Sequence, residues 1–297
     1  MRVTNSMMVN TLNRNLSNSM RVMDKTQNQL STGKRISKGS DDPVGVAYAM
    51  RMRTNIVETE QYQKNVSDAL SWLEATDSAL GDIGNALQRV RELAVNAANG
   101  THTPESLKAI NDEIRQIKDH IQNTANTNLA GRYLFSGTST GIQSYSNGVM
   151  QGNQSKVHYE IGVGIRLPIN VTAGEVFSDL DAGGNETDSI FMALDKLILD
   201  INSGDSALIS SNLSAMDKWM DKNLSTRAEV GARINRLELT DNRLNQTELN
   251  FTKLLSETED ADMAEVLTNL KMQESVYRAA LGAGARIVQP TLIDFLR

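Results

Sequence analysis

Apolar residues recur at alternating intervals of three and four near both ends of the chain, and this pattern limits the folds available to it. A mean spacing of about 3.5 residues places such side chains on one face of a helix, which is buried only against another helix. The pattern therefore predicts helices that pair with each other, with neighbouring copies, or with both. The first stripe consists of Val9, Leu12, Leu16, Met23 and Leu30. The last stripe, in two slightly offset runs, includes Leu254 and then Met263, Val266, Leu267, Leu270, Tyr277 and Leu281.

The two ends carry opposite charge. Residues 1–40 contain seven Lys or Arg against one Asp, whereas residues 257–297 contain seven acidic residues against four basic ones. This difference favours association of the two ends, in a salt-dependent way. The whole chain has a formal net charge of −6, and its basic arm lacks aromatic residues for base stacking. Nucleic acid is therefore not an expected partner.

Other bulk features exclude several classes of protein. The chain contains no cysteine, which excludes disulfides and thiolate chemistry. No apolar run approaches the roughly 18 residues that cross a bilayer, so no membrane partner is expected. The first 30 residues are polar and amphipathic and lack the apolar core of a secretory signal. Export, if it occurs, is expected to proceed without cleavage of a signal peptide.

Helical periodicity covers most of the sequence. Asp42 before Pro43 is typical of a helix start, and Gly33 is typical of a position just past a helix end. Between residues 131 and 176, glycine, β-branched and aromatic residues predict a small β region. The interval 179–188 is expected to be a polar loop. The helices are expected at residues 5–32, 43–99, 103–128, 189–202 and 206–281.

The last of these helical spans predicts the shape of the molecule. Residues 206–281 contain no proline and a single glycine, Gly231, and one helix of that length would measure roughly 110 Å. A compact globule of this chain length has a diameter of about 50 Å. We therefore expect a mainly α, elongated helical bundle with a small β insertion and terminal coiled-coil arms. The expected domains are residues 1–42 with 255–297, residues 43–135 with 186–254, and residues 136–185.

Two segments near the ends resemble signatures of bacterial flagellins. Residues 30–36 (LSTGKRI) and 40–45 (SDDPVG) are similar to the N-terminal signature. Residues 259–266 (EDADMAEV) and the ending 289–297 are similar to the C-terminal one. Within the flagellin superfamily, residues 128–137 (NLAGRYLFSG) and the compact β insertion resemble the proteins of the hook–filament junction. The resemblance covers essentially the whole chain.

The resemblance implies a structural assembly subunit. Terminal helices of the family are mobile in the free monomer and pack as an inner tube on assembly, and the insertion faces solvent. Export proceeds through the flagellar type III apparatus. The implied partners are copies of the same chain, a hook-associated protein on the hook side, flagellin, and an export chaperone. Chaperone contacts are expected at Val266, Leu270, Tyr277 and Leu281.

Residues of the two signatures are also expected to act in subunit assembly, by packing and by setting register. Asp41 and Asp42 are both expected first as a helix cap and second as partner contacts. These signature residues are Arg35, Ile36, Asp41, Asp42, Asp260 and Asp262.

Nothing in the sequence predicts an enzyme, a cofactor or a metal site. Neighbouring acids such as Glu259 and Asp260 on a helix are usually solvated. The loop from Asp179 begins like a calcium loop, but Ile190 stands where the bidentate glutamate is required. We therefore predict a non-enzymatic adaptor at the hook–filament junction, located outside the cell. The alternatives are a flagellin of the filament itself and a cytosolic coiled-coil scaffold.

Overall fold

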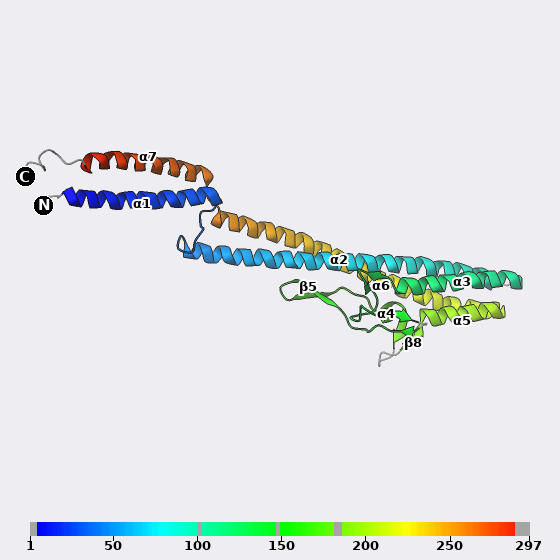
Figure 1. The fold of residues 1–297 in the computed structure, drawn as a ribbon. Helices are drawn as coiled ribbons and strands as arrows, with labels where there is room; N and C mark the ends of the chain where they lie inside the picture. Colours follow the sequence, from blue (N-terminus) through cyan, green and yellow to red (C-terminus); the bar gives the residue numbers. More distant parts are fainter. Residues whose placement is uncertain (1–4, 100–101, 147–148, 181–185, 289–297) are drawn as a thin grey trace, which may run out of the picture. The chain divides into compact units, whose positions relative to one another are not determined.

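A computed structural model describes residues 5–99, 102–146, 149–180 and 186–288 of the chain (Figure 1). The expected signature at 289–297 and the tip of the 179–188 interval lie outside these residues. The chain divides into two compact units, here called unit 1 (residues 1–58 and 247–297) and unit 2 (residues 59–246). The prediction of a mainly α chain with a small β insertion is confirmed.

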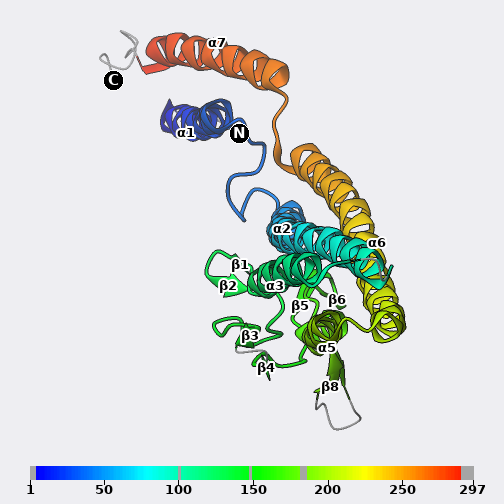
Figure 2. The same ribbon diagram turned by 90° about the vertical axis from the view of Figure 1, so that its right-hand side faces the viewer.

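Unit 1 contains the two terminal helices, α1 (Asn5–Thr32) and α7 (Met263–Val288). It also contains the beginning of α2 (Pro43–Ala98) and the end of α6 (Ser206–Glu259). Figures 1 and 2 both show α1 and α7 side by side. They run in opposite directions, because Lys34 after α1 pairs with Asp260 before α7, whereas Leu12 lies against Gly284. The predicted pairing of the two ends as helices is confirmed.

The expected single helix from residue 206 to 281 is wrong, because the chain breaks between α6 and α7. The break has a local cause at Asp262, whose Oδ1 accepts hydrogen bonds from the N–H groups of Ala264 (2.9 Å) and Glu265 (3.3 Å). Aspartate at this position satisfies the free N–H groups of a new helix. The pattern Asp262-x-x-Glu265 is a helix-start signal that the count of proline and glycine did not reveal.

In unit 2, α2 and α6 pack with α3 (Pro104–Ala125) and α5 (Ile190–Ser203). Thr103 caps α3 by accepting a hydrogen bond from the N–H of Ser106, and Ser189 caps α5 in the same way. Gly84 allows α6 to approach α2, since a Cβ there would lie 3.0 Å from Nδ2 of Asn223. That same amide donates to the carbonyl of Leu80 (3.0 Å). Glycine inside this long helix therefore serves packing.

The β insertion consists of short antiparallel hairpins. Each described strand pairs only with its neighbour in sequence: β1 (Asn128–Leu129) with β2 (Arg132–Tyr133), β3 (Tyr145–Ser146) with β4 (Val149–Met150), β5 (His158–Gly162) with β6 (Ile165–Pro168), and β7 (Ser178–Leu180) with β8 (Glu186–Ser189). A short helix, α4 (Ala173–Val176), precedes β7. The expected polar loop at 179–188 is wrong over its described part, which forms the β7–β8 hairpin.

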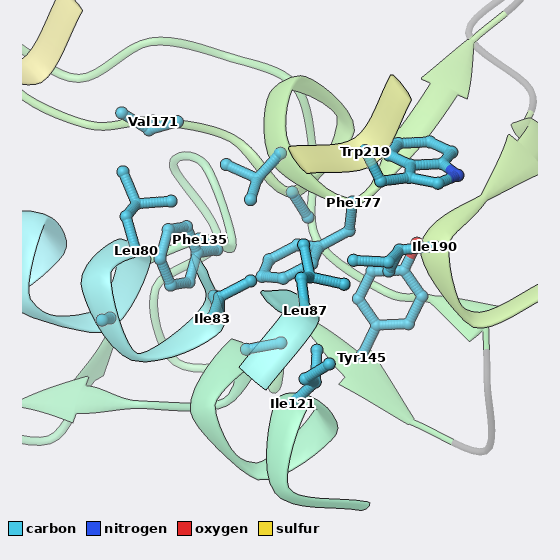
Figure 3. Close-up of a cluster of buried hydrophobic side chains, with 14 of the residues drawn as sticks. Leu80, Ile83, Leu87, Ile121, Phe135, Tyr145, Val171, Phe177, Ile190 and Trp219 are labelled. Atoms are coloured by element: carbon cyan, nitrogen blue, oxygen red, sulfur yellow. The ribbon is translucent and has the colours of Figure 1, made fainter. Parts of the chain in front are cut away.

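The core of unit 2 joins the β insertion to the helices (Figure 3). Phe135, just before the predicted insertion at 136–185, and Phe177 within it meet edge to face with ring centroids 5.3 Å apart. Tyr145 lies 4.7 Å from the ring of Phe191 at the start of α5. Each fully buried large apolar side chain contributes about 1.5–3 kcal/mol. Both tryptophans, Trp72 and Trp219, are buried here, so the insertion is an integral part of this core.

Candidate assembly site

The inner face of the α1–α7 pair, here called the seam, follows the predicted heptad spacing on α1. Val9, Leu12, Leu16, Met23 and Leu30 are half-buried. Thr26, an intervening polar position, is buried, and its hydroxyl donates to the carbonyl of Val22 (2.9 Å). A polar seam position with an internal hydrogen bond costs little to bury.

The α7 side of the seam differs from the stripe read from the sequence. Val266 is buried, and Leu270 and Tyr277 are half-buried, as expected for a helix-facing side. The remaining covered positions in the same heptad phase are Gln273, Ala280 and Gly284. A Cβ at Gly284 would lie 2.6 Å from Cδ2 of Leu12, so the absence of a side chain there permits close approach of the helices.

Four predicted stripe residues lie outside the seam and point to solvent. Leu254, Met263, Leu267 and Leu281 are 38%, 41%, 46% and 46% exposed. For the three on α7 the physical reason is helix geometry: the face that includes Val266, Ala280 and Gly284 is turned toward α1, so Met263, Leu267 and Leu281 fall on other faces. Leu254 belongs to α6 and not to the α1–α7 pair. Their expected role in assembly stays a prediction, since a side chain that does not face α1 is free to face another molecule.

A second feature, here called the junction, connects the loop after α1 to the α6–α7 break. The N–H of Arg35 donates to the carbonyl of Glu259 (2.7 Å), and the N–H of Ala261 donates to the carbonyl of Gly33 (2.9 Å). The guanidinium of Arg35 reaches the carbonyl of Thr258 (2.8 Å). Asp260 takes part through its backbone pairing with Lys34. The two flagellin-like signatures therefore contact each other directly.

Glu259 is the charged centre of the junction. Its side chain is buried, lies 2.7 Å from Nζ of Lys34, and also pairs with the guanidinium of Arg53 on α2. Burial acts to raise the pKa of this carboxyl, but the hydrogen bonds and charges of Lys34 and Arg53 outweigh it, and the pKa lies below its ordinary value. The opposite charges of the two chain ends meet in this pair.

The residues after Arg35 hold the loop in place. Ile36 is 5% exposed, and a Cβ at Gly45 would come within 2.6 Å of its Cδ1. Asp41 accepts a hydrogen bond from the N–H of Lys38 (3.1 Å), the main reason why its pKa lies below the ordinary value. Asp42 caps α2 by accepting from the N–H of Gly45 (2.9 Å). Asp42 thus caps α2, whereas the expected capping role of Asp41 is wrong, because its carboxylate accepts from N–H groups of the preceding loop instead.

The sequence did not mark Lys34 and Arg53 as site residues. For Glu259 it predicted a solvated acid or, from the family resemblance, a packing and register role between subunits. The charge difference between the ends was the available signal for Lys34. No periodic pattern marks Arg53, because its partner lies 206 positions away in sequence.

The outer surface of unit 1 is rich in exposed apolar side chains. Clusters of this kind mark contact surfaces for other proteins when they are contiguous. The members are Met7, Met8, Met20, Val22, Val44, Tyr48, Met50, Val57, Leu249, Leu254, Met263, Leu267, Met272, Val276 and Leu281. Here they are called the outer apolar residues.

The described part of the chain holds no group of three or more acidic or histidine side chains that would bind a metal ion. None of its helices combines the length and apolar character needed to cross a membrane.

Comparisons with known proteins relate this chain to proteins of the bacterial flagellum. The models of the bacterial flagellin N-terminal and C-terminal helical regions match residues 3–140 and 213–296. The flagellin of Bacillus subtilis strain 168 is 33% identical over 284 residues, covering 92% of this chain and 91% of that protein. Flagellar hook-associated protein 3 of Escherichia coli K12 is 27% identical over 304 residues, covering 95% and 96%. A putative flagellar hook-associated protein from Vibrio parahaemolyticus shares the fold, with a TM-score of 0.68 at 24% identity over 74% of this chain and 100% of that one.

Proposed function

This chain belongs to the flagellin family of bacterial flagellar proteins, and from that membership we propose that it is the structural subunit that joins hook to filament. Its relation to hook-associated protein 3 extends along nearly the full length of both chains. The proposal rests mainly on the structure of unit 1. There the two signatures meet at the junction, and the outer apolar residues remain open to neighbours.

Assembly would bury the outer apolar residues of one subunit against neighbouring copies. Burial of apolar surface contributes roughly 25 cal/mol per Å², and unit 1 offers it from α1, α7, α2 and α6. The core cluster of unit 2 runs from Val66 to Leu244 and, among the described residues, includes none of α1 or α7. The terminal helices are therefore available for contacts between subunits. We propose residues 1–42 with 255–297 as the assembly domain, residues 43–135 with 186–254 as the body, and 136–185 as the insertion.

The proposed partners are copies of this chain, a hook-associated protein on the hook side, flagellin, and an export chaperone on α7. Three of the proposed chaperone contacts, Val266, Leu270 and Tyr277, belong to the seam, whereas Leu281 is exposed. A chaperone that contacts all four side chains must therefore displace α1 from α7. The proposed location is outside the cell, after export without signal cleavage. The proposed role is structural and involves no catalysis.

Deletion of residues 1–30 or 265–297 tests the proposal. Unit 2 should keep its fold, because its core lies between Val66 and Leu244, while flagella stop growing beyond the hook. Immunogold labelling of isolated flagella should place the intact protein at the hook–filament boundary. Normal swimming after either deletion contradicts the proposal.

A second candidate is a subunit of the filament itself, which the 33% identity to a flagellin favours. The two functions differ in a simple property of the purified chain. A filament subunit polymerises alone into long filaments that immunogold decorates along their whole length. A junction subunit labels one short zone and does not elongate alone. Protein confined to the cytosol and independent of flagellar export would instead indicate a coiled-coil scaffold.

A further inference from the structure

Methionine is concentrated in unit 1 and is exposed there. Nine of the thirteen methionines fall within residues 1–58 and 247–297. Among the described residues, six exposed methionines belong to unit 1, and Met192 is the exposed one of unit 2. The six are Met7, Met8, Met20, Met50, Met263 and Met272, which are 61%, 42%, 47%, 62%, 41% and 53% exposed.

These six side chains contrast with the covered methionines of the same unit. Met23 is half-buried in the seam, and Met52 of α2 is only 7% exposed. The exposed ones lie on α1, α7 and the beginning of α2, and α1 and α7 run side by side in Figures 1 and 2. Thioether groups on flexible stems adapt to irregular partner surfaces, which suits an interface between subunits.

From this distribution we propose that the six exposed methionines are sites of reversible oxidation, and that hydrogen peroxide converts the free subunit into a form that cannot assemble. The inference rests on the proposed function, because it assigns the consequence to the same outer apolar residues. The assembled subunit is protected, since the interface would cover these side chains.

The oxidation needs only peroxide as co-reactant, and its reversal needs a dithiol. The thioether sulfur attacks one peroxide oxygen with a lone pair, an S–O bond forms, and the O–O bond breaks. The departing hydroxide takes the proton from the transferred oxygen and leaves as water. Sulfur loses two electrons, peroxide gains them, and the product is methionine sulfoxide. Sulfoxide reductases return it to methionine with two electrons and two protons from a dithiol, which becomes a disulfide while the oxygen leaves as water.

The sulfoxide affects assembly rather than folding. In the free subunit the new S=O group stays in water, so it requires no internal partner. At an apolar interface the same group must give up water without a guaranteed hydrogen-bond donor, which is unfavourable. Several sulfoxides on one interface multiply this effect.

The test compares full-length protein before and after brief exposure to hydrogen peroxide. Mass spectrometry should find sulfoxide at the six positions well before Met52 or Met216, which are 7% and 0% exposed. Far-ultraviolet circular dichroism should stay unchanged. Incorporation at the hooks of cells that lack the protein should fall at least tenfold, and treatment with sulfoxide reductases should restore it.

A variant with all six methionines replaced by leucine supplies the matched comparison, because leucine has a similar volume and does not react. Its ratio of treated to untreated incorporation should stay near one, whatever its untreated level. The Met192→Leu control in unit 2 should behave as the wild type in both states.

The outcomes separate the two proposals. If oxidised wild-type protein is incorporated as well as untreated protein, the inference is wrong and the proposed function stands. If the six-leucine variant is as sensitive as the wild type, or reductases do not restore incorporation, oxidation acts elsewhere and the inference is also wrong. If untreated protein is not incorporated at all, the proposed function fails and the inference with it.

Discussion

At the residue scale, one carboxylate connects three segments of unit 1. Glu259 accepts from Lys34 of the loop after α1 and from Arg53 of α2, and its own carbonyl accepts the N–H of Arg35. Removing one partner of a buried ion pair destabilises the fold by more than the intact pair stabilises it, because the remaining charge stays buried without a partner. The junction therefore depends on this side chain more than on any of its exposed neighbours.

Glu259→Gln should weaken the junction by about 1–2 kcal/mol, a value reduced for the partial exposure of Lys34 and Arg53. The amide keeps the shape of the side chain but loses the charge. Hydrogen exchange at the N–H groups of Arg35 and Ala261 should accelerate accordingly. The control is Glu257→Gln, whose exposed pair with Lys253 spans 3.9 Å and should change exchange very little. Equal effects of the two substitutions contradict a special role for Glu259.

The junction should also respond to acid. Because the pKa of Glu259 lies below its ordinary value of 4.5 in the folded chain, the carboxylate stabilises the fold above that ordinary value. This contribution is lost as pH falls through the lowered pKa. Exchange protection at Ala261 should be constant from neutral pH to about 5 and then decline. The Glu259→Gln chain should show a smaller decline over the same interval, and an identical pH profile contradicts the assignment.

Two glycines near the end of α7 provide a matched pair. A Cβ at Gly282 meets nothing within 4 Å, so Gly282→Ala should stabilise α7 by about 0.5–1 kcal/mol. Gly284→Ala gains the same helix propensity but places Cβ 2.6 Å from Cδ2 of Leu12. It should therefore give less stability than Gly282→Ala, measured by urea unfolding. Leu12→Ala should remove the difference, whereas equal effects with Leu12 in place contradict close packing of the seam.

At the element scale, sequence periodicity predicted most helices to within a few residues, because capping residues such as Thr103 and Asp42 mark their starts. It did not predict the α6–α7 break, because the absence of proline concealed the local helix start at Asp262. Nor did it predict the pairing of Lys34 with Asp260 beside the break, which joins distant parts of the sequence. It also did not predict which face of α7 meets α1, because small residues, here Ala280 and Gly284, carry no hydrophobic signal. Long-range pairing and close approach are properties of the fold that local patterns do not contain.

The pairing of α1 with α7 should depend on the seam. An isolated helix of the length of α1 is marginal in water, so α1 draws its stability from α7. Leu16→Asp places a charge on the half-buried face and should cost about 2 kcal/mol. Exchange should then accelerate along both α1 and α7. Ser17→Asp, one residue away on the exposed side, should change little, and a comparable effect there contradicts the observed helix face.

At the scale of the whole molecule, the two units differ in how much they bury. The large core cluster belongs to unit 2. Among the described residues of unit 1, the buried apolar side chains are few: Ile36, Ala49, Met52 and Val266. Burial of apolar surface is the dominant stabilising contribution in folding. The two parts of the chain therefore differ in stability even though α2 and α6 run through both.

Unfolding in urea should accordingly show two steps. Unit 1 should lose exchange protection first, including α2 up to about residue 58 and α6 from about residue 247, as the unit boundary implies. Protection around Leu80, Leu87 and Trp219 should persist to higher urea. A single cooperative loss of protection over the whole chain contradicts this division.

The position of the two tryptophans gives the molecule a built-in optical label. Both Trp72 and Trp219 lie in the core of unit 2, and their indole N–H groups have no hydrogen-bond partner among the described residues. Unit 1 carries tyrosines such as Tyr48 and Tyr277 instead. Indole emission excited beyond the tyrosine band thus reports on the body of the subunit and should stay constant when the terminal helices open, close or dock.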